Sequence, residues 1–316
     1  MAAAFDITPE KQAGQLHFLS SQVVETKAPV LTPKDVDLSG QTAIVTGGNV
    51  GVGFETARQL LSVGVSKLIL AVRSEASGQA AAEKLMGSRK DGPQTVEVWK
   101  LDLGEWASVT AFADRVGKTL DARPDVVVLN AGIICAQPTI NPSTGHDEDI
   151  QTNYLSTVLL LVLLLPILKA KPSAATATKD PVPHISVVSS IMAHWAKFAE
   201  RTAEPLLPSF DNKATANWDM EERYSASKLL ALMFMTELSR RVPRNVAIIN
   251  APTPGLTHGS SFMRQTSGTM LGLFIGVFYR LFGHDCTVGS SQVLAAAVRA
   301  GPESHGHFME NGKLRP

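Results

Sequence analysis

Tyr224 and Lys228 lie four residues apart in the segment Tyr-Ser-Ala-Ser-Lys, a spacing that places both side chains on one face of a helix. A nearby ammonium favours the phenolate, so Lys228 is expected to lower the pKa of Tyr224. A phenol tuned in this way can give a proton to a carbonyl during reduction, or take one from an alcohol. The same pair also occurs on ordinary protein surfaces, so its meaning depends on the groups around it.

Other polar residues follow predicted strands or interrupt a predicted apolar helix. Ser189 and Ser190 follow one strand, and Asn130-Ala131-Gly132 ends another. Asn153 lies early in an otherwise apolar helix, where a buried amide needs a hydrogen-bonding partner. Because ligands of open α/β sheets bind at the carboxyl ends of the strands, these groups can face one site together with Tyr224.

A glycine-rich turn, Thr46-Gly47-Gly48-Asn49-Val50-Gly51-Val52-Gly53, comes between a predicted strand and a predicted helix. The glycines at 47, 51 and 53 let the backbone turn tightly and approach a pyrophosphate. The first N–H groups of the helix would point at that anion. The sequence therefore predicts a dinucleotide site here; the alternative is a turn that binds nothing.

The residues at the end of the second predicted strand distinguish an NAD site from an NADP site. An acidic residue about 20 positions after the glycines would hold the ribose 2′-hydroxyl and favour NAD. This chain has Ala71-Val72-Arg73-Ser74 there. Arg73 can pair with a 2′-phosphate, which predicts NADP(H) as the cofactor. The alternative is that Arg73 is an ordinary surface arginine.

The elements that position these residues alternate between strand and helix. Most predicted strands are continuously apolar, which indicates a parallel sheet covered by helices on both faces: an α/β, doubly wound (Rossmann) single domain. The predicted strands are 42–45, 67–72, 95–99, 126–129, 184–188 and 245–250, and the predicted helices are 54–63, 75–86, 107–120, 150–168 and 224–241.

Composition limits the remaining classes of protein. The 316 residues are 44% hydrophobic and 18% charged, which excludes a disordered chain. Lys and Arg number 29, as do Asp and Glu, so no global basic charge favours nucleic acid. Only two cysteines, Cys135 and Cys286, are present, which favours a reducing, cytoplasmic setting. The eight histidines form no metal-ligating pattern, so no metal site is predicted.

Two apolar runs, Val158–Leu168 and Met270–Tyr279, are shorter than the ~17 residues that a membrane-spanning helix needs. The first is interpreted as a buried helix, and no transmembrane span is predicted. The second is interpreted as a lid or core helix, with peripheral contact with a membrane or an apolar partner left open. Residues 1–38 show no clear period and are interpreted as an N-terminal extension of a domain over residues 39–316.

Taken together, these motifs resemble the short-chain dehydrogenase/reductase family over roughly residues 40–312. The resemblance depends on their order and spacing: Thr46-Gly47-x-x-x-Gly51-x-Gly53, Asp102, Asn130-Ala131-Gly132, Asn153, Ser190, Tyr224-x-x-x-Lys228 and Pro254-Gly255. Within the family the chain looks like the retinol-dehydrogenase-like branch, and more closely like filamentous-fungal members found with secondary-metabolite pathways. The cues are Leu-Ala-Val-Arg-Ser, the glycine turn and the aromatic-rich stretch before Tyr224.

The resemblance implies a catalytic group of four. Tyr224 would be the general acid or base, and Lys228 would lower its pKa and bind the nicotinamide ribose. Ser190 would polarise the substrate carbonyl, with Ser189 as the alternative, and Asn153 would hold a water in the proton relay. The implied cofactor-binding residues are Gly47, Asn49, Val50, Gly51, Val52, Gly53, Arg73, Asp102, Asn130, Ala131, Gly132, Tyr224, Lys228, Pro254 and Gly255.

We therefore expect an NADP(H)-dependent oxidoreductase that interconverts a carbonyl and an alcohol on an apolar small molecule, with reduction in secondary metabolism as the favoured role. Loops near 191–223 and 256–285 are expected to shape the substrate pocket, and Trp195, Phe198, Phe210 and Trp218 to form either its wall or part of the core. A non-catalytic NADP(H)-binding scaffold or sensor, a retinoid or steroid dehydrogenase, and a homodimer stay open as alternatives.

Overall fold

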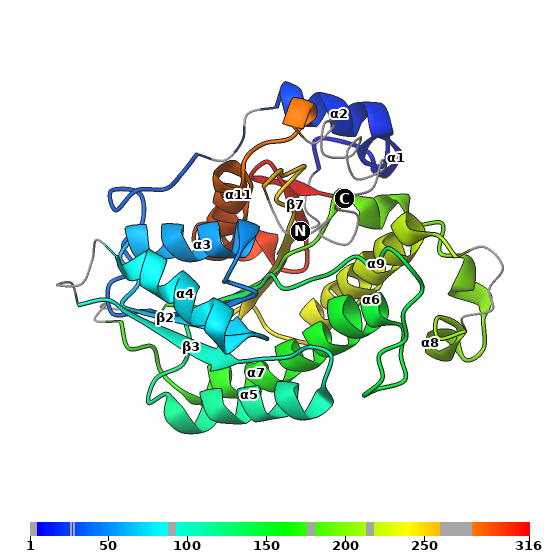
Figure 1. The fold of residues 1–316 in the computed structure, drawn as a ribbon. Helices are drawn as coiled ribbons and strands as arrows, with labels where there is room; N and C mark the ends of the chain where they lie inside the picture. Colours follow the sequence, from blue (N-terminus) through cyan, green and yellow to red (C-terminus); the bar gives the residue numbers. More distant parts are fainter. Residues whose placement is uncertain are drawn as a thin grey trace.

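The computed structural model describes residues 5–25, 27, 29–87, 93–175, 181–212, 218–259 and 280–316. Within these residues the chain forms an eight-stranded sheet in the order β3-β2-β1-β4-β5-β6-β7-β8 (Figure 1). Neighbouring strands from β3 across to β7 run parallel, and β8 pairs antiparallel with β7. The strands are β1 Thr42–Thr46, β2 Lys67–Val72, β3 Thr95–Lys100, β4 Val126–Leu129, β5 His184–Val187, β6 Ile248–Pro252, β7 Phe308–Glu310 and β8 Lys313–Arg315.

Helices cover both faces of this sheet, as the sequence predicted, so the doubly wound α/β fold is confirmed. The α-helices are α1 Pro9–Gln12, α2 Gln15–Val23, α3 Gly51–Ser62, α4 Glu75–Met86, α5 Trp106–Thr119, α6 Glu148–Ile150, α7 Thr157–Ala170, α8 Leu206–Ser209, α9 Met220–Ser239 and α11 Cys286–Val298. A π-helical turn, η1 Gln151–Ser156, joins α6 to α7, and short 3₁₀ turns are η2 Ile191–Trp195, η3 Ala199–Thr202 and η5 Pro302–Ser304.

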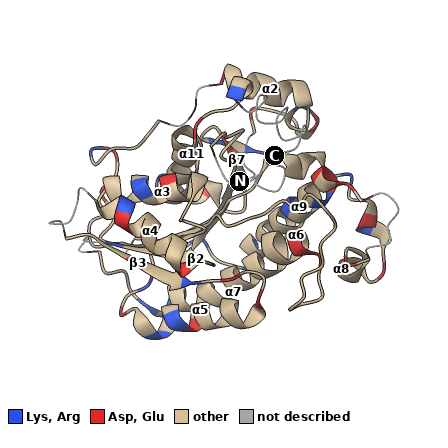
Figure 2. Cartoon of the chain, viewed as in Figure 1, with Lys and Arg blue, Asp and Glu red and all other residues tan. Residues whose placement is uncertain are grey.

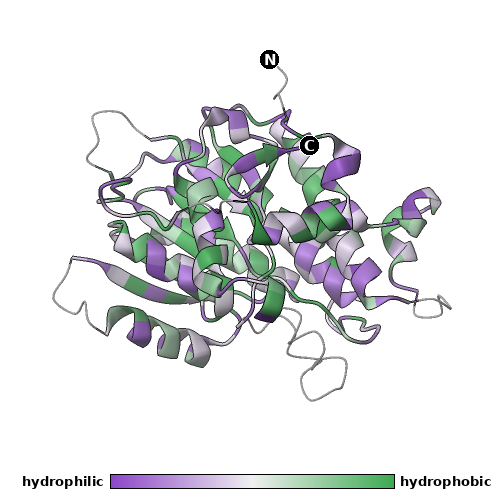
Figure 3. Cartoon of the chain, turned by 90° about the horizontal axis from the view of Figure 1, so that it is seen from above, coloured by the Kyte–Doolittle hydropathy of each residue, from purple (hydrophilic) through white to green (hydrophobic). Residues whose placement is uncertain are grey.

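Alternating side chains of the strands build two cores. Along β1, Ala43 and Val45 pack on the face covered by α3, α4 and α11, while Ile44 packs on the face covered by α5, α7 and α9. This two-residue alternation is a geometric property of strands. Figure 3 shows the result as apolar strands in the centre, with helices that are apolar on one side and polar on the other.

The start of α9 and the presence of α11 differ from the prediction for identifiable reasons. The helix α9 begins at Met220 rather than at Tyr224, because the Asp219 carboxylate accepts a hydrogen bond from the Glu222 N–H at 2.7 Å and caps the helix. The helix α11 was not predicted from the sequence, because Gly289, Ser290 and Ser291 near its start hide its apolar pattern. Both helices pack directly on the sheet.

The apolar run 158–168 belongs to a continuous helical segment over residues 148–170, which is long and apolar enough to cross a membrane by length and composition alone. Leu160, Leu161, Leu164 and Leu168 of α7 nevertheless lie in the core that α5 also contributes to. This packing is what a core helix of an α/β domain shows. The second run, Met270–Tyr279, lies outside the described residues.

Charged residues of both signs are interspersed on the outer helices. Figure 2 shows Lys and Arg beside Asp and Glu on α3, α4 and α5. The balance of 29 basic and 29 acidic residues in the sequence therefore appears as a mixed surface on these helices. Such a surface favours solubility over binding to a polyanion.

Candidate active site

A cleft of about 770 Å³ opens at the carboxyl ends of the strands. It lies where the strand order reverses between β1 and β4, the topological switch point at which α/β sheets bind ligands. All but one of the predicted site residues line this cleft: Gly47, Asn49, Val50, Gly51, Val52, Gly53, Arg73, Asp102, Asn130, Ala131, Gly132, Ser190, Tyr224, Lys228, Pro254 and Gly255. The exception is Asn153, which is buried directly behind it.

The glycine turn forms a tight cradle between β1 and α3. Gly47 and Gly51 adopt φ values of +64° and +58°, which favour glycine. A Cβ at Gly53 would lie 2.4 Å from both the Asn130 Nδ2 and the Gly47 carbonyl oxygen. No side chain caps the start of α3. The turn and the uncapped N–H groups of α3 therefore fit a dinucleotide pyrophosphate.

The side chain of Asn130 fastens this cradle to the end of β4. Its Nδ2 donates to the Thr46 carbonyl oxygen at 3.0 Å, and the Ala131 N–H donates to the Thr46 Oγ1 at 2.9 Å. These bonds bring the two strand ends on either side of the switch point together. Asn130 is therefore a positioning group for the turn as well as part of the cleft wall.

The far end of the cleft carries Arg73, Ser74 and Asp102. Arg73 is exposed, and no ion pair to it is found among the described residues. The Asp102 carboxylate accepts from the Gly104 N–H at 3.0 Å, and the Asp102 N–H donates to the Ser108 Oγ at 2.8 Å. Asp102 is thus held at the cleft edge, and the Arg73 guanidinium is available for an anionic group of a ligand.

Tyr224 and Lys228 both face the cleft from one side of α9, as their spacing predicted. The Lys228 Nζ lies 5.8 Å from the centre of the Tyr224 ring and donates to the Val188 carbonyl oxygen at 2.9 Å. Burial lowers the pKa of Lys228 to about 8, against the opposing charge of Asp149, which raises it. The ammonium is therefore poorly solvated and well placed to stabilise negative charge on a neighbouring oxygen.

Ser190 is placed to bind a substrate oxygen. It caps η2, and its Oγ accepts from the Met192 N–H at 3.2 Å, so its own proton is available to a ligand in the cleft. Ser189 also lines the cleft but is 6% exposed, with its Oγ buried. Of these two candidate serines, Ser190 has the hydroxyl that is more accessible to a ligand in the cleft.

Asn153 lies in the π-helical turn between α6 and α7, a local irregularity often found at functional sites. Its Oδ1 accepts from the Ile133 N–H at 2.9 Å. Its Nδ2 donates to the Ile133 carbonyl oxygen at 2.9 Å and to the Ser227 Oγ at 3.0 Å. The amide therefore ties the loop after β4 to α9. Whether it also holds a water for a proton relay stays a prediction.

Asp149 is a buried carboxylate beside Cys135 that was not predicted from the sequence. It accepts from the Cys135 N–H at 3.2 Å, and its burial raises its pKa from 3.8 to about 7. The folded state therefore holds a proton on Asp149 at pH values where the unfolded chain does not. The free energy of unfolding therefore decreases as pH rises from 4 through 7, and the total decrease is roughly 4 kcal/mol.

Replacing Asp149 by asparagine is expected to remove this pH dependence. The melting temperature of Asp149→Asn relative to wild type should rise by several degrees between pH 5 and pH 8, because only the wild type becomes charged. Differential scanning fluorimetry at both pH values measures it. Asp114→Asn, at an exposed position on α5, is the control and should show no such trend. A constant difference between Asp149→Asn and wild type would contradict the raised pKa.

The aromatic residues before Tyr224 divide between the cleft and the core. Trp195 lines the cleft. Phe198 stacks on Phe210 with ring centres 6.3 Å apart, and the Arg223 guanidinium lies over the Phe210 ring at 4.9 Å. Trp218 does not line the cleft. One of the four aromatics therefore forms part of a pocket wall, and two form a small cluster beside α9.

N-terminal residues supply one wall of the cleft, which was not predicted from the sequence. Gln15, Phe18 and Leu19 of α2 line the cleft. Their spacing of i, i+3 and i+4 is the signal that could have revealed a helix face, although residues 1–38 were interpreted as showing no period. Among the described residues, no group of three or more His, Cys, Asp or Glu side chains is arranged so that it could hold a metal ion.

Comparison with known proteins agrees with this geometry. The family described as "short chain dehydrogenase" matches residues 41–190. The short-chain dehydrogenase fogG of Aspergillus ruber is 46% identical, with 100% of this chain and 89% of that protein covered. The short chain dehydrogenase/reductase mfmJ of Annulohypoxylon moriforme is 41% identical over 91% of this chain and 80% of that protein.

Solved structures share the fold at lower identity. The Pseudomonas aeruginosa RhlG/NADP active-site complex has a TM-score of 0.62 and 19% identity, covering 86% of this chain and 95% of that one. A short-chain type dehydrogenase/reductase from Mycobacterium marinum has a TM-score of 0.63 and 16% identity, covering 88% and 96%. Given the identity to fogG over the whole length of the sequence, the chain belongs to the short-chain dehydrogenase/reductase family, whose members are NAD(P)-dependent oxidoreductases.

Proposed function

We propose that this oxidoreductase uses NADP(H) to interconvert a carbonyl and an alcohol on an apolar small molecule, with reduction as its cellular direction. The observation that carries the proposal is the position of Tyr224. It faces the same cleft as the glycine turn and Ser190, with the Lys228 ammonium 5.8 Å from its ring centre. An acid, a cation and a hydroxyl donor therefore surround one reaction space.

The preference for NADP(H) over NAD(H) is supported by Arg73. Its guanidinium lines the cleft at the end of β2, where an NAD-binding site would carry a carboxylate. A 2′-phosphate carries negative charge that arginine binds with two parallel hydrogen bonds. The RhlG structure of similar fold is itself an NADP complex.

The chain's own residues supply the proton and the orientation. The cofactor held by the glycine turn and Arg73 would supply the hydride for the carbonyl carbon. The Ser190 hydroxyl donates to the carbonyl oxygen, and the Tyr224 hydroxyl transfers its proton to that oxygen as the alcohol forms. The Lys228 ammonium, fixed by the Val188 carbonyl, stabilises the phenolate left on Tyr224. Asn153 supports this arrangement by tying the loop after β4 to Ser227, on the helix that carries Tyr224.

The substrate class is inferred from the side of the cleft beyond Tyr224. Apolar side chains converge there: Phe18, Leu19, Ile191, Met192, Trp195 and Met220. Such a lining favours a ring-bearing apolar compound, in the range of polyketides, terpenoids, steroids and retinoids. The fungal source of the relatives fits a role in secondary metabolism.

Replacing Arg73 by aspartate is expected to weaken NADPH binding by at least tenfold while changing NADH binding less than threefold. The carboxylate repels a 2′-phosphate and can accept from a ribose 2′-hydroxyl. Fluorescence titration of the purified protein with each nucleotide measures both dissociation constants. Arg58→Asp on α3, outside the cleft, serves as the control for charge reversal. Equal losses for NADPH and NADH would contradict the role of Arg73.

The activity itself is tested by NADPH oxidation at 340 nm with aromatic ketones, quinones, and retinoid and steroid carbonyls. Turnover that Tyr224→Phe abolishes would support the proposed reductase. A retinoid or steroid turned over faster than the other compounds would identify the retinoid or steroid dehydrogenase alternative. Tight NADPH binding with no turnover of any compound would favour a cofactor-binding scaffold and contradict the proposal.

A further inference from the structure

The N-terminal helix α2 covers the substrate end of the cleft. Phe18 is 7% exposed, and its ring meets the Trp195 ring edge-on with centres 5.1 Å apart. Gln15 and Leu19 lie on the same helix face and line the cleft with it. Trp195 comes from the excursion after β5, so Phe18 and Trp195 form an aromatic corner between two segments far apart in the sequence.

The same helix holds the loop after β6. Gln22 is 1% exposed, and its Oε1 accepts from the Leu256 N–H at 2.9 Å. Gly255, with φ +73°, comes so close that a Cβ there would lie 2.8 Å from the Gln22 Oε1. The His284 ring also bonds the Gln22 carbonyl oxygen at 2.7 Å. The helix α2 is therefore in contact with the loop expected to border the nicotinamide.

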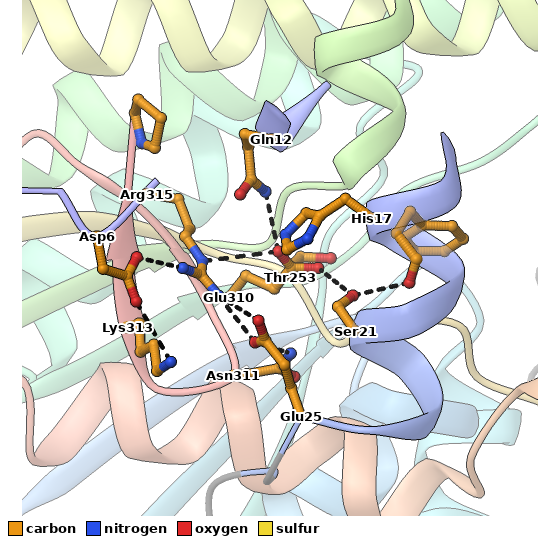
Figure 4. A network of polar contacts seen from close by, with 12 residues as sticks. Asp6, Gln12, His17, Ser21, Glu25, Thr253, Glu310, Asn311, Lys313 and Arg315 are labelled. Carbon is orange, nitrogen blue, oxygen red and sulfur yellow. Dashed lines mark hydrogen bonds and ion pairs between the residues drawn. The ribbon is translucent and has the colours of Figure 1, made fainter. Parts of the chain in front are cut away.

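Buried polar contacts fix residues 6–25, which contain α1 and α2, to the strands β7 and β8 (Figure 4). The Glu310 carboxylate, 2% exposed, accepts from the Gln12 Nε2 at 2.9 Å and the Ser21 Oγ at 3.4 Å. Arg315, 1% exposed, pairs with Glu25 at 2.8 Å and with Asp6. Leaving one of these buried charges without its partner would be strongly destabilising. The N-terminal segment that contains α2 is thus a fixed part of the fold.

We propose that α2 is a wall of the substrate site and that Phe18 is a specificity-determining residue, which contacts the apolar rings of the substrate. This inference deepens the proposed function and depends on it for its turnover assay. The aromatic corner favours flat ring systems, because aromatic pairs gain energy beyond their buried area. The position of Phe18 also limits the number of fused rings that fit between α2 and Tyr224.

The test compares Phe18→Ala with Leu16→Ala in the full chain. Leu16 lies on α2 but is 84% exposed, away from the cleft, so it matches the change in helix propensity and size. NADPH oxidation is measured with 1-tetralone and with the larger 9,10-phenanthrenequinone. Phe18→Ala is expected to raise KM for 1-tetralone about tenfold, equivalent to ~1.4 kcal/mol, and to shift preference toward the larger ring system.

The control Leu16→Ala should leave both kinetic constants unchanged, and the NADPH dissociation constant should change less than twofold in either variant. If Phe18→Ala does not fold, Phe18→Leu keeps most of the volume and should still raise KM for 1-tetralone by about threefold. Unchanged KM and unchanged ring preference in a folded Phe18 variant would overturn the proposal.

A binding assay separates this inference from the proposed function. Titration of the NADP⁺-loaded protein with 2-naphthol, followed by tryptophan fluorescence, needs no turnover. If Phe18→Ala binds naphthol more weakly and the wild type is inactive on every carbonyl compound, the result would support the role of Phe18 in the substrate site. The same result would contradict the proposed reductase activity. If the wild type turns over a carbonyl compound and Phe18→Ala has unaltered naphthol binding and KM, the result would support the proposed reductase activity. It would overturn the role of Phe18 in the substrate site.

Discussion

Replacing Tyr224 by phenylalanine is expected to lower kcat for carbonyl reduction by about 10³-fold while NADPH binds within twofold of the wild-type affinity. The substitution removes the proton donor but keeps the ring over which the Lys228 ammonium lies, and a positioned general acid contributes 10²–10⁴-fold. Steady-state kinetics and fluorescence titration on the same preparation measure the two quantities.

The chain offers a matched control in Tyr154. This tyrosine lies in the π-helical turn, packs against Phe234 with ring centres 6.3 Å apart and does not line the cleft. Tyr154→Phe should therefore retain kcat within a few-fold. Turnover retained by Tyr224→Phe would place the proton donor elsewhere in the cleft, and loss in both variants would indicate a general effect on folding.

Replacing Gly53 by alanine is expected to weaken NADPH binding by at least 100-fold. The added Cβ would lie 2.4 Å from the Asn130 Nδ2 and from the Gly47 carbonyl oxygen, so the turn or the amide must move. Either movement displaces the backbone that approaches the pyrophosphate, and such overpacking costs about 1–3 kcal/mol or more. Isothermal titration with NADPH measures the effect.

Gly117 on α5 provides the control for this substitution. A Cβ there would meet the Ile167 side chain at 3.5 Å, an ordinary contact. Gly117→Ala should bind NADPH as wild type does and gain up to about 1 kcal/mol of helix stability. Wild-type affinity in Gly53→Ala would show that the cradle tolerates a side chain, which would contradict the role assigned to the turn.

The parts of the fold that were predictable depend on short-range patterns. The run Val126–Leu129 is apolar at every position and bounded by polar residues, and it forms β4 with those bounds. The helix Glu75–Met86 begins after Ser74, whose Oγ accepts from the Ser77 N–H. The residues of the cleft could be placed together because they follow strands whose carboxyl ends share one edge of the sheet.

The parts that were missed depend on partners distant in the sequence. Gln12 and Glu310 are separated by 298 positions, and neither reveals by its own neighbours that it is buried. The helix α2 has a mixed composition, and its contacts are with Glu310 of β7 and with the loop after β6. Asp149 resembles an acidic residue in the first turn of a helix, whereas its pKa is raised chiefly by burial and also by the nearby charge of Asp147. Local periodicity cannot report such contacts.

The bonds from Glu310 and Arg315 to the N-terminal residues have a consequence for synthesis of the protein. Residues 6–25 leave the ribosome long before residues 310–315 exist, so these N-terminal residues lack their buried polar partners during most of translation. The wall that α2 contributes to the cleft therefore cannot complete its contacts until β7 and β8 have joined the sheet, which makes it one of the last parts of the fold to assemble.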